Sequence, residues 1–124
     1  MKKSIIPRKV SFKTDLLAPS ALEALTIQIL GASVVYSEPG LKLFHLDDGT
    51  LIEFYGPGSF PPEGMFDSGN MIVSFKVSDI EMSALTLADL GATVIDGITH
   101  SCSTHAYCHV KLKDETVIGL YQEN

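Results

Sequence analysis

Short stretches of alternating apolar and polar residues make up most of this chain, and two segments follow a different pattern. Alternation is typical of β-strands that bury one face. In the two other segments, apolar residues recur three or four positions apart, as they do along one face of a helix. These positions are Leu22, Leu25 and Ile29 in the first segment and Met82, Leu85 and Ala88 in the second. The pattern predicts two helices of about three turns, each burying that face, among several strands.

Both predicted helices have start and stop signals. A serine is followed three positions later by a glutamate at residues 20–23 and again at residues 78–81. This is the capping-box pattern, in which the two side chains satisfy free amides at the start of a helix. Gly31 and Gly91 follow the last apolar positions. Glycine enters the left-handed conformation that ends many helices without steric cost, so the helices are expected to end there.

The two halves of the chain resemble each other at three places, in the same order. A repeated supersecondary unit is strong evidence for architecture. The matching pairs are Val-Ser-Phe-Lys at 10–13 and 73–76, Leu-Gly-Ala-Ser-Val-Val at 30–35 with Leu-Gly-Ala-Thr-Val-Ile at 90–95, and Asp-Gly-Thr-Leu-Ile-Glu-Phe-Tyr at 48–55 with Asp-Glu-Thr-Val-Ile-Gly-Leu-Tyr at 114–121. Each half is therefore predicted to contain a strand, a helix and three further strands.

Turn-forming residues separate the predicted strands and the two repeats. Residues 38–40, 47–49 and 113–115 have the composition of tight turns between antiparallel strands. Residues 56–64 are too rich in proline and glycine for regular structure and suit a connector. We therefore predict one domain over residues 1–124, with repeat one at about 8–56, a connector at 57–69 and repeat two at about 70–122.

Composition limits the classes of function. The formal net charge is −6 and no basic stripe offsets it, so the surface would repel a phosphate backbone, and nucleic-acid binding is not expected. No apolar stretch has the length of a signal peptide core or of a membrane span, which predicts a cytoplasmic protein without membrane contact. Two cysteines are too few for a disulfide scaffold, so reduced thiols are expected.

A duplicated β-α-β-β-β unit with these helix boundaries and a closing Asp-Gly-Thr-Leu-Ile-Glu-Phe-Tyr strand resembles the vicinal oxygen chelate superfamily, which includes glyoxalase, bleomycin-resistance and dioxygenase proteins. The resemblance covers nearly the whole chain. It implies an α+β fold in which two tandem βαβββ repeats form a cup-shaped, partly open barrel of mixed sheet. It also implies that a small molecule binds inside the cup, and that the protein is a homodimer.

Family members usually place metal ligands on the first and last strands of each repeat. Carried onto this chain, the pattern falls on Lys9, Glu53, Ile72 and Gly119, of which only Glu53 has a metal-binding side chain. A divalent ion generally needs three or more protein ligands, and the charge of Lys9 would compete with it. We therefore predict no cofactor and no metal ligand, with a divalent metal ion held by unusual ligands as the alternative.

Strand alternation predicts what the cup contains instead. If Ile52 and Phe54 face the helices, Glu53 and Tyr55 face the cup. In the second repeat, the equivalent positions Gly119 and Tyr121 then face the cup as well. The predicted site has Glu53 as its catalytic candidate. The predicted ligand-binding residues are Lys9, Tyr55, His105, Tyr107, His109 and Tyr121.

Two interpretations of Glu53 follow from its inward position. A carboxylate on a buried face must be paired, or its pKa rises, and a raised pKa would suit a general base. Alternatively, Glu53 forms a structural salt bridge to Lys9 or another lysine of the cup. Two interpretations also apply to the inward tyrosines. They stack on a planar ligand, or they serve as packing or dimer contacts.

Residues 100–109 gather three histidines and both cysteines, which suggests a soft-metal site or a Cys-His pair. Alternation weakens both hypotheses. His105 and His109 share a face, but Cys108 should point to the other side and act as a small buried apolar residue. The first hypothesis is therefore a protein that binds a small organic molecule in the cup without metal. The alternatives are a lyase, isomerase or dioxygenase-type enzyme that is metal-dependent or uses Glu53 as a base, and a non-catalytic structural or regulatory module.

Overall fold

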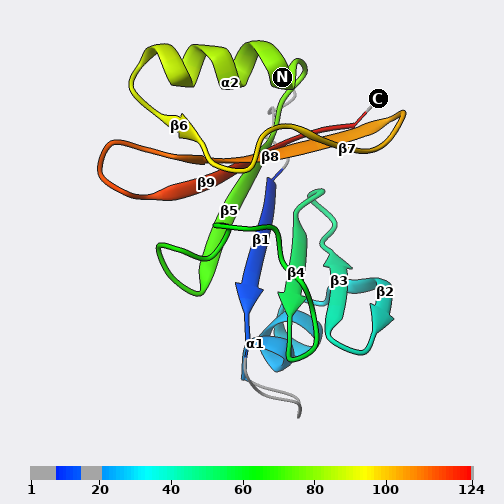
Figure 1. The fold of residues 1–124 in the computed structure, drawn as a ribbon. Coiled ribbons are helices and arrows are strands. Elements are labelled where there is room, and N and C mark those ends of the chain that lie inside the picture. The colour runs from blue at the N-terminus through cyan, green and yellow to red at the C-terminus, as the bar shows by residue number, and fades with distance from the viewer. Residues whose placement is uncertain (1–7, 15–20, 124) are drawn as a thin grey trace.

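The computed structural model describes residues 8–14 and 21–123 of the chain. The first repeat contains β1 (Arg8–Lys13), α1 (Ala21–Ala24) continued by a π-helical turn η1 (Leu25–Ile29), β2 (Ser33–Glu38), β3 (Leu41–His45) and β4 (Leu51–Tyr55). The second contains β5 (Met71–Lys76), α2 (Ile80–Asp89), β6 (Thr93–Val94), β7 (Thr99–Cys102), β8 (His105–Lys111) and β9 (Val117–Glu123). Figure 1 shows the strands between the two helices, with α2 at the top of the view and α1 at the bottom.

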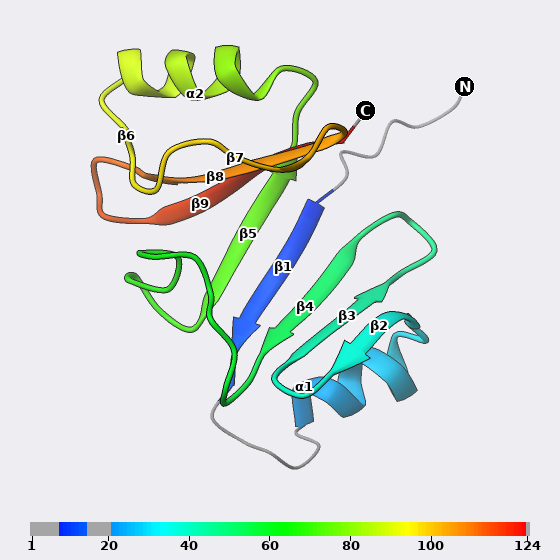
Figure 2. The same ribbon diagram turned by 45° about the vertical axis from the view of Figure 1, so that its right-hand side comes forward.

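The described strands form one nine-stranded mixed sheet in the order β2-β3-β4-β1-β5-β9-β8-β6, with β7 paired to β8. Each first strand pairs in parallel with the last strand of its own repeat, and β1 and β5 join the repeats in antiparallel orientation. Figure 2 shows that β5 runs beside β1, whereas β8 and β9 run in a different direction from the strands of the first repeat. The sheet does not close, so the predicted α+β, cup-shaped fold is confirmed.

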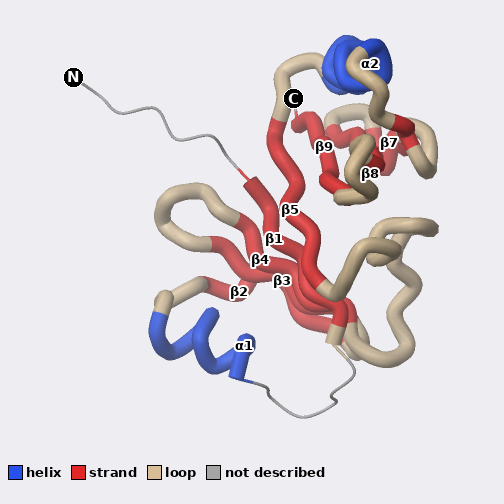
Figure 3. Tube along the Cα trace, turned by 90° about the vertical axis from the view of Figure 1, so that its left-hand side faces the viewer, coloured by secondary structure: helices blue, strands red, loops and turns tan. Residues whose placement is uncertain are grey.

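The two helices cover the outer face of the sheet. Figure 3 shows α1 against the strands of the first repeat and α2 against β8 and β9. The core under α2 combines Ile80 and Ala84 with Ala106, Cys108 and Val110 of β8 and with Leu120 of β9. In the first repeat, Phe44, Ile52 and Phe54 form the buried cluster. No helix of the described residues is long and apolar enough to cross a membrane.

The predicted buried face of α2 is wrong. Met82 and Leu85 are 58% and 56% exposed, whereas Ile80 and Ala84 are buried. Helix α2 carries two apolar stripes of similar spacing, and the small Ala84 lets the helix approach the sheet closely. In the first helix, Leu22 and Leu25 lie on the predicted side and line a groove with Val10, Phe12 and Ile52 of the sheet, but they are 38% and 39% exposed. Ile29 is 74% exposed, and the buried residue is Thr26, whose hydroxyl donates to the carbonyl of Leu22. Periodicity alone could not choose between faces.

The predicted helix ends are only partly correct. The residue that caps α2 is Asp79, whose carboxylate accepts from the amide of Met82 at 3.0 Å, so Ser78 is not the cap. The serine expected to cap the first helix, Ser20, lies outside the described residues. Gly31 and Gly91 both have positive φ, 69° and 101°, after their helices, as expected.

Repeat two differs from repeat one after its helix. Where β2 is continuous, the second repeat has two short strands, β6 and β7, separated by residues 95–98. Both pair with β8, with Val94 opposite Val110 and Thr99 opposite Tyr107. Residues 95–98 therefore bulge out opposite residues 108 and 109. The predicted three strands after the helix are four in the second repeat, because this bulge divides one of them.

Candidate functional site

A cavity of about 360 Å³ opens on the concave face of the sheet, where the two repeats meet. Alternation along the strands brings side chains from both repeats into it, since every second residue of a strand faces the same side. All seven residues predicted for the site line it: Lys9, Glu53, Tyr55, His105, Tyr107, His109 and Tyr121. Strand parity was therefore sufficient to bring these residues together.

Several residues that are not among the predicted site residues also line the cavity. The connector contributes Phe60, Pro62 and Met65, while Tyr36 and Ser101 come from the edge strands β2 and β7. Met65 is buried, but Phe60 is 95% exposed at the cavity mouth. The sequence shows that Tyr36 is aromatic, but it does not predict the bend of the sheet that brings β2 over the cavity.

Glu53 is held by two neighbours on the inner face. Its Oε1 accepts a hydrogen bond of 2.8 Å from the Ser11 hydroxyl and lies 3.8 Å from Nζ of Lys9. The same ammonium lies 5.6 Å from the centre of the Tyr121 ring. Lys9 thus connects the carboxylate of repeat one to an aromatic side chain of repeat two. The ion pair considered from the sequence is present, and it gives Glu53 a partner.

Tyr55 lies beside this pair as a neutral phenol. Burial raises its pKa, and the nearby charge of Glu53 raises it further. Its ring packs edge-on against Phe66, with the ring centres 5.6 Å apart. Tyr55 can therefore offer its hydroxyl or ring edge to a ligand without adding a second negative charge to this wall of the cavity.

The place equivalent to Glu53 in repeat two is Gly119, and the structure shows why it has no side chain. A β-carbon at Gly119 would overlap Oγ of Ser74 and would lie 2.8 Å from the Ser74 β-carbon. Ser74 pairs with Gly119 as Ser11 pairs with Glu53. The two repeats therefore keep the serine of this pair, but only repeat one keeps the carboxylate.

The residues at these positions do not fit a divalent metal ion. Glu53 is the only anionic group among them, Lys9 supplies a positive charge 3.8 Å away, and Ser74 fills the space at Gly119. Among the described residues, no three His, Cys, Asp or Glu side chains are grouped so that they could hold a metal. Hard divalent ions need several oxygen or nitrogen donors and no competing cation.

His109 is the most strongly held histidine of the cavity. Its Nδ1 lies 2.7 Å from Oδ2 of Asp96, and its amide donates to Oδ1 of the same carboxylate at 2.8 Å. The side chains of His109 and Asp96 are 5% and 10% exposed. Asp96 comes from the bulge between β6 and β7, which no local sequence pattern identified as part of the site.

Four rings form a row across the second repeat's side of the cavity. Tyr107 lies between His105 and His109, with ring centres 6.1 and 6.2 Å from theirs, and His105 stacks on Tyr121 at 6.4 Å. Ser101 Oγ lies 2.9 Å from Nδ1 of His105. Such a row presents both ring faces and ring edges to a planar ligand.

The two cysteines do not join this row. Cys108 is fully buried under α2, and burial, together with the charge of Asp96, raises the pKa of its thiol to about 11. Cys102 is exposed, and hydrogen bonds from Thr104 lower the pKa of its thiol. The parity argument that placed Cys108 away from the cup therefore agrees with the structure, and no Cys-His pair forms there.

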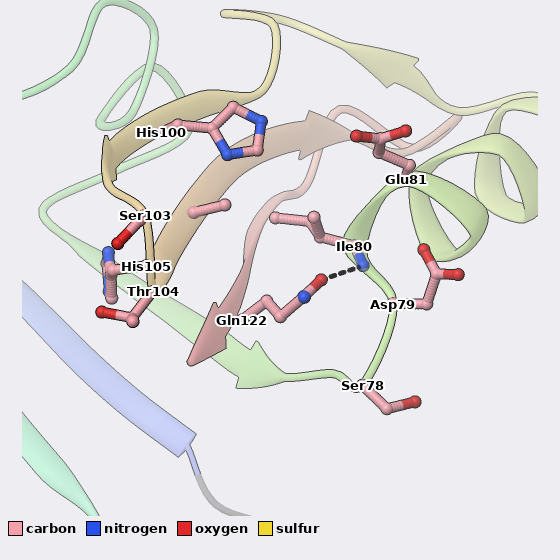
Figure 4. Close-up of a pocket in the computed structure, with 10 residues that line it drawn as sticks. Ser78, Asp79, Ile80, Glu81, His100, Ser103, Thr104, His105 and Gln122 are labelled. Atoms are coloured by element: carbon pink, nitrogen blue, oxygen red, sulfur yellow. Dashed lines mark hydrogen bonds between the residues drawn. The ribbon is translucent and has the colours of Figure 1, made fainter. Parts of the chain in front are cut away.

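A second, more polar pocket of about 370 Å³ lies between the start of α2 and the β7–β8 hairpin. Figure 4 shows its residues, with Oε1 of Gln122 accepting from the amide of Ile80 at 2.8 Å. Asp79 is used as the cap of α2. Because these polar groups hold the helix start in place, we assign the functional site to the concave cavity, with which this pocket shares His105.

Comparison with solved structures supports the fold. A glyoxalase/bleomycin resistance protein/dioxygenase superfamily member from Vibrio splendidus 12B01 aligns over 96% of this chain and 100% of its own, with a TM-score of 0.64 and 16% identity. Methylmalonyl-CoA epimerase from Mycobacterium tuberculosis aligns over 100% and 93%, with a TM-score of 0.59 and 14% identity. A trihydroxybiphenyl dioxygenase from Sphingomonas wittichii RW1 aligns over 98% of this chain but 42% of its own, with a TM-score of 0.66 and 14% identity.

No protein-family model matches the sequence, and no curated protein matches it either. The structural similarity covers nearly the whole chain at low identity. The protein therefore has the fold of the glyoxalase/bleomycin resistance/dioxygenase superfamily, and the resemblance expected from its sequence is confirmed at the level of the fold.

Proposed function

We propose that this protein binds a small organic molecule in the concave cavity, without a metal ion. The observation that carries the proposal is the lining of the cavity, which combines a row of rings with one ion pair and one fixed histidine. Its volume of about 360 Å³ lies within the range of small-molecule sites. A planar ligand would stack on Tyr107 or Tyr121 and direct polar groups toward Lys9 and His109.

The fold supports the same proposal. Two of the similar structures are named for chemistry on small molecules, an epimerase of methylmalonyl-CoA and a dioxygenase of trihydroxybiphenyl. The third carries a superfamily name that includes glyoxalase, bleomycin resistance and dioxygenase proteins. We take from these names the general class of small-molecule partners for this chain, and none of the particular substrates.

The binding proposal can be tested by a thermal-shift screen of small aromatic and polar compounds, followed by calorimetry on the hits. Binding of one molecule per chain should be lost in Tyr107→Ala and weakened in Lys9→Met. The matched control is Met82→Gln, because Met82 is 58% exposed on α2, away from the cavity. Hits that bind all three variants equally would place the ligand elsewhere.

The metal-free part of the proposal has its own test. Elemental analysis and calorimetric titration with divalent ions should show no stoichiometric metal, and chelator should leave ligand binding unchanged. One tight ion per chain that disappears in Glu53→Gln would overturn this part and turn the search toward glyoxalase-like or dioxygenase substrates.

A second candidate function is a proton-transfer enzyme of the lyase or isomerase type. It is favoured by the fact that Glu53 and His109 both line one cavity from different repeats. Glu53 would act as the base if the ligand displaced Lys9 from it, since its oxygens would then be free to accept the proton. Incubation of a bound compound in deuterated water should then exchange one of its carbon-bound protons, and Glu53→Gln should stop that exchange.

Homodimer formation is also proposed. Strand β2 is an open edge of the sheet, and Val34 and Val35 on it are 59% and 47% exposed, next to Leu30 at 48%. Apolar edges of this kind commonly pair with another chain. Light scattering after size exclusion should give twice the chain mass, and the Val34→Lys variant should have the mass of a monomer.

A cytoplasmic location is also proposed. It is consistent with two free thiols and can be checked by cell fractionation.

A further inference from the structure

The bulge between β6 and β7 is where the second repeat departs from the first. In repeat one, β2 pairs with β3 from Ser33 to Glu38 with a single shift of register. In repeat two, residues 95–98 lie opposite only residues 108 and 109 of β8. Bulges commonly reorient a side chain beside a functional site. The side chain that this bulge brings inward is Asp96.

Asp96 holds both the backbone and the ring of His109. Its two oxygens accept from the His109 amide at 2.8 Å and from Nδ1 at 2.7 Å, while the amide of Ile95 donates to the His109 carbonyl at 2.9 Å. Both side chains are at least nine-tenths buried. A short bond of this kind between buried groups fixes the rotation of the ring.

The same geometry determines which ring nitrogen carries the proton. An ionised carboxylate can only accept hydrogen bonds, so Nδ1 must be the donor. In a neutral ring, the lone pair then lies on Nε2. Asp96 does not line the cavity, whereas His109 does, so the ring edge opposite Asp96 is the one presented to the cavity. Among the described residues, none forms a hydrogen bond with Nε2.

We infer that Asp96 is a positioning residue that makes Nε2 of His109 the hydrogen-bond acceptor of the cavity. The ligand that fits this arrangement is a planar molecule with a hydroxyl or N–H donor on its edge. Its ring would lie beside Tyr107, whose ring centre is 6.2 Å from that of His109. The inference rests on the proposed binding function and adds to it the chemical class of the ligand.

The state of the His109 ring can be measured without a ligand. Nitrogen-15 NMR of histidine-labelled protein at about pH 8, above the ordinary titration range of an imidazole, distinguishes the two neutral tautomers and the imidazolium. The wild type should show His109 protonated on Nδ1. In Asp96→Asn, the amide oxygen is needed by the His109 backbone N–H, so the NH₂ group faces Nδ1 and the proton should move to Nε2.

His105 serves as the internal control for this measurement, because it lies beside Ser101 and has no contact with Asp96. Its tautomer should not change in Asp96→Asn. The exposed Asp89→Asn, at the end of α2, should leave both histidines unchanged. An Nε2–H tautomer or an imidazolium at His109 in the wild type, or identical spectra for the wild type and Asp96→Asn, would overturn the inference.

The ligand class is tested with a matched pair of probes, a naphthol and the fluoronaphthalene of the same substitution pattern. They have similar size, but only the naphthol has a donor. The wild type should bind the naphthol about five to ten times more tightly, the value of one neutral hydrogen bond. His109→Phe, which has no ring nitrogen, should bind both probes with equal affinity.

The outcomes separate this inference from the binding proposal on which it rests. If the wild type binds both probes equally, the donor preference and this inference fail, while the binding function stands. If neither probe binds in the cavity, both fail. Because the wild-type comparison of two probes needs no variant, it remains decisive even if Asp96→Asn does not fold.

Discussion

The hydroxyl of Ser74 occupies the space that a side chain on Gly119 would need. Gly119→Ala should therefore destabilise the protein by about 2 kcal/mol, because a new methyl group overlaps a packed, buried side chain. Urea unfolding measures this change. In the double variant with Ser74→Gly, most of the loss should be recovered, since both overlapping atoms of Ser74 are removed. Equal stability of Gly119→Ala and the wild type would show that Ser74 can move aside.

The pair of Lys9 and Glu53 should be energetically coupled. Lys9→Met leaves the 6% exposed Glu53 without a cationic partner and is expected to cost about 2 kcal/mol. With Glu53→Gln already present, the same change should cost about 1 kcal/mol less, because no buried charge is left unpaired. A double-mutant cycle from chemical unfolding gives the coupling, and strictly additive effects would contradict it.

Glu115 takes the backbone conformation that its counterpart in repeat one reaches with glycine. Its φ is 74°, and Gly49 at the equivalent turn has a φ of 89°. A side chain in this region costs energy that glycine avoids, so Glu115→Gly should stabilise the protein by about 0.5 to 1 kcal/mol. Glu115→Ala is the control, since it removes the exposed ion pair with Lys111 but keeps the strain. A gain of equal size in both variants would point to the charge instead.

The two cysteines should differ strongly in reactivity. Hydrogen bonds from Thr104 lower the pKa of Cys102, whereas burial raises that of Cys108 to about 11. Alkylation requires the thiolate, so at about pH 8 Cys102 should react quickly and Cys108 only after unfolding. Peptide mass spectrometry after timed alkylation measures both. Thr104→Val should slow the reaction of Cys102, and rapid labelling of Cys108 in the folded protein would contradict its burial.

Asp48 and Asp114, at equivalent turns of the two repeats, should make stability fall in acid. Each accepts from the amide two residues later, Thr50 or Thr116, and these bonds lower the pKa of both carboxyls in the folded state. Their contribution is present above the ordinary pKa of aspartate, near 3.9, and is lost as the pH falls through the lowered folded values. Stability curves of the Asp48→Asn/Asp114→Asn variant should fall less steeply below about pH 4. An unchanged slope would contradict the prediction.

Much of the site could be predicted because it depends on strand parity. Once Glu53 is placed inward, alternation places Tyr55 on the same side of the sheet. Tyr121 is the counterpart of Tyr55 in the second repeat, so it is also placed inward. The buried face of α2 could not be predicted, because Met82 and Ile80 are both apolar and the choice depends on where the sheet lies. Asp96 was missed for a related reason: its partner, His109, is distant in sequence and meets it only through a bulge in the pairing.

The sequence by itself determined the repeated unit, the order of its elements, the glycines that end both helices and the inward face of each long strand. These features are encoded by residues close together in the chain, where backbone sterics and alternation act directly. Only the tertiary structure decided the side of α2 that is buried, the bulge that brings Asp96 to His109, and the contact between Ser74 and Gly119. Such features depend on how the two halves of the sheet bend and pack, because long-range contacts select among local patterns that are otherwise equally favourable.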